Sequence, residues 1–245
     1  MRKFFRKVAV GLLIFSVTTA GVAISSPKAE AFSLGDITGG LGKILGVGKG
    51  VDINTANERM LENFYYSVAL LKAAYDNVKI ATDSSIANKE AIMTDSVARS
   101  AVKNNTPAVN MKDGAAQSKK EAEDMKKYLD SVIAEGDEEK LKQIDAIIKV
   151  ANEQRLVSNV MAHIAYTQIG IITATQVTNV ASGNLEGIGN IIAIAKETEA
   201  LLKIRNELSA QLKTATESYR KTRGIKDPSK KEQKEAAKKI EALKG

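Results

Sequence analysis

The chain of 245 residues is long enough to bury one sizeable hydrophobic core or two small ones. It contains no cysteine and a single histidine, which excludes disulfide bonds and zinc sites built from these ligands. Its formal charge is +7, from 36 Lys and Arg against 29 Asp and Glu, and five of the basic residues lie within the first 31 positions.

Residues 1–31 are predicted to be a signal peptide. Basic residues at positions 2–7 precede an apolar stretch over 8–22, and Ala29-Glu30-Ala31 offers the small residues after which a signal peptidase cuts. An uncleaved N-terminal anchor is the alternative. Cleavage before Phe32 removes five basic residues and one acidic residue, and leaves 31 basic against 28 acidic. Such a mixed surface argues against a nucleic-acid partner, and we expect a periplasmic, cell-surface or secreted protein.

Residues 32–52 form a glycine-rich segment, with seven glycines between positions 35 and 50. Interior glycines disfavour a helix, so one interpretation is a flexible leader. The alternative is a short amphipathic helix that lies on a membrane or a partner, because its apolar residues have helical spacing and three glycines are four residues apart. The candidate contact residues are Leu34, Ile37, Leu41, Ile44, Leu45, Gly42, Gly46 and Gly50.

A long amphipathic helix is predicted next, and it opens the helical domain expected over residues 53–224. Thr55 and Glu58 have the spacing of a capping box. Apolar residues then recur every three or four positions, the pattern of a coiled-coil seam, at Leu61, Phe64, Val68, Leu71, Tyr75 and Val78. The helix either continues for about 50 residues towards Pro107 or breaks near Asp83.

Two further helices are predicted to follow a loop. Ser118 and Glu121 suggest a second capping box, before an apolar face at Ala122, Met125, Leu129, Val132 and Ile133. Gly136 is expected to end this helix in the left-handed conformation and Asp137 to cap the next. The third helix opens with Leu141, Ile144, Ile147, Ile148 and Ala151.

The central stretch, residues 156–185, contains no Asp, Glu, Lys or Arg and is therefore expected to be buried. Its many polar residues argue against a membrane span. It is interpreted as core helix, with a helical hairpin or a β-hairpin over residues 164–195 as alternatives because Ile, Thr and Val are frequent. A fourth helix is predicted from Gly187 to Gly224, and residues 225–245 form a lysine-rich tail helix that starts at Asp227-Pro228-Ser229.

In this arrangement alone, an uncharged hairpin between long helices of an exported protein, the sequence resembles the α-helical pore-forming toxins. The resemblance implies that residues 156–195 or 32–50 could insert into a membrane. It carries no residue-level motif and assigns no site.

Candidate catalytic or metal-binding groups are scarce in the sequence. His163 has no Glu three residues before it, as a di-iron bundle requires, and it is interpreted as a hydrogen-bonded interior residue. There is no Gly-x-Ser-x-Gly elbow. Neighbouring carboxylates are interpreted as solvated, at Glu58 and Glu62, at Glu121 and Asp124, and at Glu135, Glu138 and Glu139.

We therefore expect an all-α protein, an elongated antiparallel bundle of about four long helices with a C-terminal tail helix. Its expected function is that of an exported, non-catalytic structural or interaction protein that binds a protein partner or itself, with membrane contact as the alternative. The sequence identifies no catalytic residue, cofactor, metal site or small-molecule substrate.

Overall fold

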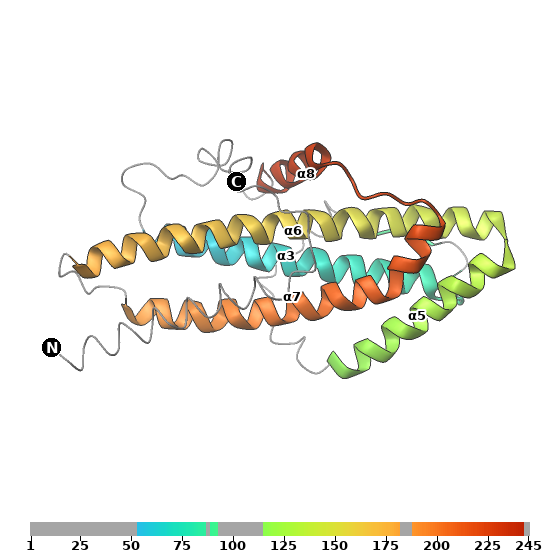
Figure 1. The fold of residues 1–245 in the computed structure, drawn as a ribbon, viewed down its shortest axis with the longest axis horizontal. Coiled ribbons are helices and arrows are strands. Elements are labelled where there is room, and N and C mark those ends of the chain that lie inside the picture. The colour runs from blue at the N-terminus through green and yellow to red at the C-terminus, as the bar shows by residue number, and fades with distance from the viewer. Residues whose placement is uncertain (1–52, 87–88, 93–114, 182–187, 243–245) are drawn as a thin grey trace. The chain divides into compact units, whose positions relative to one another are not determined.

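The computed structural model describes residues 53–86, 89–92, 115–181 and 188–242, and every regular element in them is a helix (Figure 1). The predicted signal peptide and the glycine-rich segment lie outside the described residues. In chain order the helices are α3 (Ile53–Thr82), α5 (Ala115–Glu135), α6 (Glu138–Ala181), α7 (Ile188–Thr222) and α8 (Lys230–Ala242). The prediction of an all-α fold is confirmed for this part of the chain.

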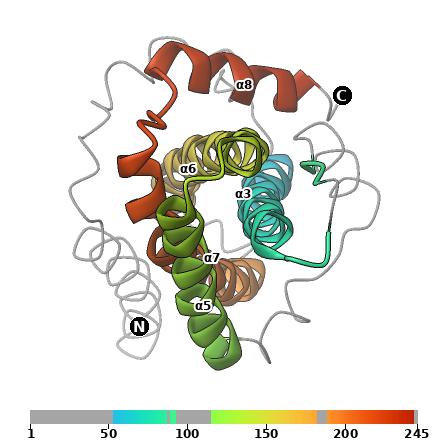
Figure 2. The same cartoon turned by 90° about the vertical axis from the view of Figure 1, so that its right-hand side faces the viewer.

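The chain divides into two compact units, and α3, α6 and α7 contribute to both. Unit 1 comprises Met1–Arg59 and Gln168–Glu199, and unit 2 comprises Met60–Thr167 and Ala200–Gly245. Within unit 2, α3, α6 and α7 lie side by side (Figures 1 and 2), and their buried apolar side chains form a shared core. Unit 2 also contains α5 and α8.

The seam predicted on α3 is buried in unit 2. Its residues Phe64, Val68, Leu71, Tyr75 and Val78 are each at most 5% exposed, and only Leu61 is half-buried. Their spacing of three and four residues keeps them on one face of the helix, where they meet the core. The predicted capping box is wrong, however, because α3 begins at Ile53 and Thr55 is already inside the helix.

The break predicted near Asp83 is confirmed. α3 ends at Thr82, and the Asp83 carboxylate accepts hydrogen bonds from the Ser85 amide (2.9 Å) and hydroxyl (2.6 Å). The chain beyond the turn is attached to the core at Ile92. The Ile92 amide donates to Asn77 Oδ1 (2.6 Å), and its carbonyl accepts from Gln154 Nε2 (2.7 Å). The alternative of one continuous helix past residue 86 is therefore wrong.

The link between α5 and α6 is built as predicted. Gly136 has a φ of 72°, a left-handed conformation that glycine adopts without strain. The Asp137 carboxylate then accepts from the amides of Glu139 and Lys140, both at 3.1 Å, and so caps α6. At the other end, α5 begins at Ala115 and not at Ser118, so the second predicted capping box is also wrong.

The central stretch is helical where the structure describes it. α6 continues to Ala181 and α7 starts at Ile188, so the β-hairpin alternative is wrong for these residues. In unit 2, the first part of the stretch is buried at Leu156, Val157, Met161, Ile164 and Ala165, each no more than 8% exposed. Packing of this apolar surface outweighs the weak strand preference of its β-branched residues. None of the helices in the described ranges has the length and hydrophobicity needed to cross a membrane.

α7 ends at a Schellman motif that positions the tail. Gly224, at a φ of 64°, donates to the Lys221 carbonyl (3.4 Å), and the Ile225 amide donates to the Arg220 carbonyl (2.9 Å). Ser229 and Glu232 then form a reciprocal capping box at the start of α8, which confirms the predicted start of the tail helix.

The loop between α7 and α8 is attached to α6. The Asp227 carboxylate pairs with Arg155 of α6 (3.1 Å) and with Arg220 of α7, and it accepts a hydrogen bond from Asn152 (3.2 Å). One exposed aspartate thus connects the loop to both helices.

Candidate functional site

The polar side chains of unit 2 gather at several places between its helices, and one group surrounds Arg205 of α7. The Arg205 Nε donates to Ser67 Oγ on α3 (3.0 Å), and Nη2 donates to Asn159 Oδ1 on α6. Ser67 in turn exchanges hydrogen bonds with Ser158, whose hydroxyl donates to the Ser67 carbonyl (2.7 Å). One guanidinium therefore bridges α3, α6 and α7.

Arg205 has no carboxylate partner among the described residues. Burial lowers the pKa of its guanidinium, and the only charge effect opposing this comes from Tyr166. A buried cation without an acid loses hydration that its neighbours replace only in part. The Ser67 and Asn159 oxygens satisfy some of its donors, but they supply no negative charge.

His163 and Tyr166 lie on the same face of α6 as Asn159. Successive residues of an α-helix are turned by about 100°, so positions 159, 163 and 166 fall within an arc of about 60°. The Tyr166 ring packs edge-to-face against Phe64 of α3, with ring centroids 5.3 Å apart. Ser67, Asn159, His163, Tyr166 and Arg205 are called the Arg205 cluster below.

The prediction that His163 is a hydrogen-bonded interior residue is wrong in one respect. The side chain is half-buried, but its Nε2 atom is buried and has no hydrogen-bond partner within the described structure. Burial lowers the pKa of the imidazole, which is therefore neutral at pH 7. The ring presents an unused polar atom to its surroundings.

Tyr166 likewise makes no hydrogen bond with the described residues, since its interactions there are the ring contact and the charge of Arg205. Burial raises the pKa of Tyr166 to about 12, so the hydroxyl keeps its proton and can donate it. The Arg205 cluster thus combines a cation, a phenol and an imidazole that retain capacity to donate.

The carboxylates that the sequence groups together lie in different surroundings. Glu58 and Glu62 are exposed, as expected. Glu121 differs from the prediction, because it is half-buried and joins α5 to α3: it accepts from the Tyr75 hydroxyl (2.9 Å) and pairs with Lys79 (2.7 Å).

No known protein family, curated protein or solved structure matches this chain. Its chemistry must therefore be argued from its own residues. The described ranges contain no group of three or more His, Asp or Glu placed to hold a metal ion. The predicted contact residues of the glycine-rich segment, Leu34 to Gly50, lie outside the described residues, so their arrangement stays a prediction.

Sequence reasoning missed Arg205, although a signal was present. The residue lies four positions after Leu201 and three before Leu208, both buried, so a charge interrupts the apolar face of its helix. Its neighbours Ser67 and Asn159 come from distant parts of the chain, and no spacing rule would have joined the three.

Proposed function

We propose that the chain is an exported, non-catalytic helical protein that acts by binding a protein partner or a second copy of itself in the cell envelope or outside the cell. Its finer architecture would be the elongated antiparallel bundle of about four long helices and a tail helix that the sequence predicts.

The observation that supports this proposal is how unit 2 uses its polar side chains. Asn77 of α3 donates to Gln154 of α6 (2.8 Å). Asp145 of α6 accepts from the Tyr219 hydroxyl of α7 (2.8 Å) and pairs with Arg223 (2.9 Å). These groups link one helix to another, which is the use expected in a scaffold that presents a surface.

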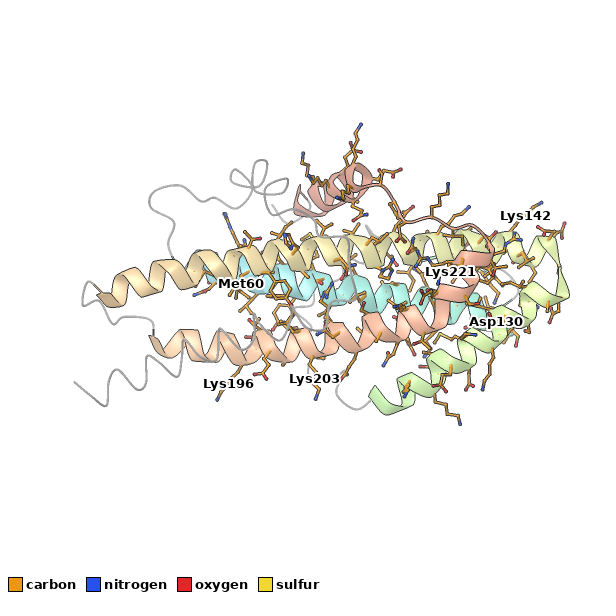
Figure 3. All side chains as sticks on the ribbon, viewed as in Figure 1. Met60, Asp130, Lys142, Lys196, Lys203 and Lys221 are labelled. Atoms are coloured by element: carbon orange, nitrogen blue, oxygen red, sulfur yellow. The ribbon has the colours of Figure 1, made fainter. Side chains whose placement is uncertain are left out.

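Photo-crosslinking in exporting cells tests the proposal. A photoreactive residue at Leu41, within the candidate contact segment, should give one discrete adduct with a protein, either this chain or another. The same residue at Lys142, which is exposed on α6 (Figure 3), is the matched control and should give none. Mass spectrometry of the mature chain should also find Phe32 as its first residue.

The membrane-active alternative predicts a different result. Leu41 would then crosslink to lipid, and the purified chain would release dye from vesicles. That result, or an intact Met1 terminus, would contradict the proposed function.

A further inference from the structure

The Arg205 cluster has more hydrogen-bond donors than unit 2 uses. Arg205 donates hydrogen bonds from Nε to Ser67 and from Nη2 to Asn159, which leaves its Nη1 group without a partner among the described residues. His163 Nε2 and the Tyr166 hydroxyl are also unused there. All three belong to half-buried side chains, and the His163 Nε2 atom is itself buried.

The two unused groups on α6 belong to the face of that helix to which Arg205 is bonded. Asn159 and Tyr166 both interact with Arg205, the first by a hydrogen bond and the second through its charge. His163 lies between them on the same face of α6, so its ring is directed to the same side of the helix. α3 contributes Phe64 and Ser67 to this region, and neither carries a charge.

No carboxylate among the described residues compensates the charge of Arg205. A guanidinium prefers planar anions that accept two parallel hydrogen bonds, as carboxylates and phosphates do. A cation held between helices without an acid is costly, and that cost falls when an anion occupies the region. Ser67 and Asn159 meanwhile fix the guanidinium in one orientation, which reduces the entropy lost on binding.

We propose that the Arg205 cluster is a binding site for a small oxyanion, a carboxylate or a phosphate group, which accepts hydrogen bonds from Arg205 Nη1, Tyr166 Oη and His163 Nε2. Arg205 supplies the positive charge, and the hydrogen bonds from Tyr166 and His163 orient the anion. Half-buried donors on two neighbouring helices, α6 and α7, suit a free small anion better than a broad protein surface. The site is independent of whether the chain also binds a protein partner.

Thermal melts of the purified full chain in Tris chloride, with inorganic phosphate or acetate added at constant ionic strength, test the site. A ligand that binds only the folded state raises Tm as its concentration exceeds Kd. At a 100-fold excess over Kd, we expect an increase of several degrees, with sodium chloride alone giving none.

Two variants with the same change of charge separate the site from general electrostatics. Arg205→Gln should lose the increase in Tm. Lys203→Gln, on the same helix, should keep it, because Lys203 is exposed and points away from the neighbouring helices (Figure 3). An equal increase in the parent and in Arg205→Gln would overturn the proposal.

The single histidine provides a second readout that remains valid if Arg205→Gln fails to fold. His163 is the only imidazole of an untagged chain, so its ring proton resonance can be followed alone through a pH titration. The other members of the Arg205 cluster carry one charge, that of Arg205, and one neutral phenol, that of Tyr166.

An oxyanion bound beside the ring favours the protonated imidazole, so phosphate should raise the pKa of His163. Acetate should do the same if the site takes carboxylates, and an effect of only one of the two anions identifies the class. An unchanged pKa with both anions would refute the site.

Discussion

Two half-buried arginines, Arg205 on α7 and Arg223 directly after its end, illustrate opposite uses of a guanidinium. Arg223 pairs with Asp145 of α6 through Nη2 (2.9 Å) and Nε (3.2 Å), and it also reaches Glu138 (3.5 Å). These hydrogen bonds raise the pKa of Arg223. Arg205 instead has only the neutral oxygens of Ser67 and Asn159, and burial lowers its pKa.

The difference shows which arginine is committed to the fold. At Arg223 the anion is part of the chain, so the interaction is complete and connects α6 to α7. At Arg205 the charge is placed and oriented, but the described residues provide no anion for it. A charge that is costly to bury and lacks an internal partner is a better candidate for binding than for stability.

The largest expected loss of stability comes from a new charge placed at a buried apolar position that offers it no partner. Ile164 of α6 is 4% exposed, and by the helical repeat it lies on a different face from Asn159 and His163. Ile164→Asp would bury a carboxylate among apolar side chains and cost several kcal/mol, a large share of a domain's stability of about 5–15 kcal/mol.

We expect this variant to show no cooperative melt by circular dichroism. Ala146→Asp, at an exposed position of the same helix, is the control and should melt like the parent. A normal melt of Ile164→Asp would mean that unit 2 tolerates unpaired charges generally, and the contrast between the two arginines would then carry no information.

The next largest loss of stability should follow removal of Asp145, the carboxylate that pairs with Arg223. Asp145→Ala leaves Arg223 without its main partner and the buried Tyr219 hydroxyl without its acceptor at 2.8 Å. The lost hydrogen bond of Tyr219 alone corresponds to about 1–2 kcal/mol. Urea unfolding should show a lower midpoint at an unchanged slope, whereas Asp124→Ala, in an exposed pair with Lys127, should change little. Equal midpoints would show that the Asp145 pair does not stabilise unit 2.

Sequence patterns predicted the elements whose signals are local. The Gly136 turn with its Asp137 cap and the Ser229 capping box each depend on residues within a few positions, and each was correct. The boxes proposed at Thr55 and Ser118 failed because a cap contributes only about 1 kcal/mol. The described helices begin upstream of both residues, at Ile53 and Ala115.

The Arg205 cluster could not be predicted in the same way. Its members lie on α3, α6 and α7, and helical periodicity shows which face a residue occupies but not which helix that face meets. The sequence did indicate that His163 was unusual as the only histidine. That its Nε2 atom has no hydrogen-bond partner among the described residues follows from how the helices pack, which helical periodicity does not encode.

Replacement of the two arginines themselves should affect the stability of the chain to different extents. Arg223→Met leaves Asp145 without its cation and should lower Tm. Arg205→Met removes both a desolvation cost and the hydrogen bonds to Ser67 and Asn159, so in Tris chloride its free energy of unfolding should stay within about 1 kcal/mol of the parent. A loss from Arg205→Met as large as that from Arg223→Met would make Arg205 a structural residue and weaken the case for a site.

The smallest effect concerns the pH dependence that His163 imposes. Because burial lowers its pKa in the folded chain, the unfolded chain binds more protons between the folded pKa and the ordinary value near 6.5. The stabilising contribution of neutral His163 is complete above pH 6.5 and declines as pH falls through this window towards the folded pKa.

Melts in chloride buffers between pH 8 and 5 should show a steeper loss of Tm for the parent than for His163→Gln, which cannot titrate. Addition of phosphate should flatten the parent's profile alone, since an anion beside the imidazole favours its protonated form. Parallel profiles for parent and variant without phosphate would mean that His163 is as well solvated folded as unfolded, and the ring would then have no unused polar atom to offer a ligand.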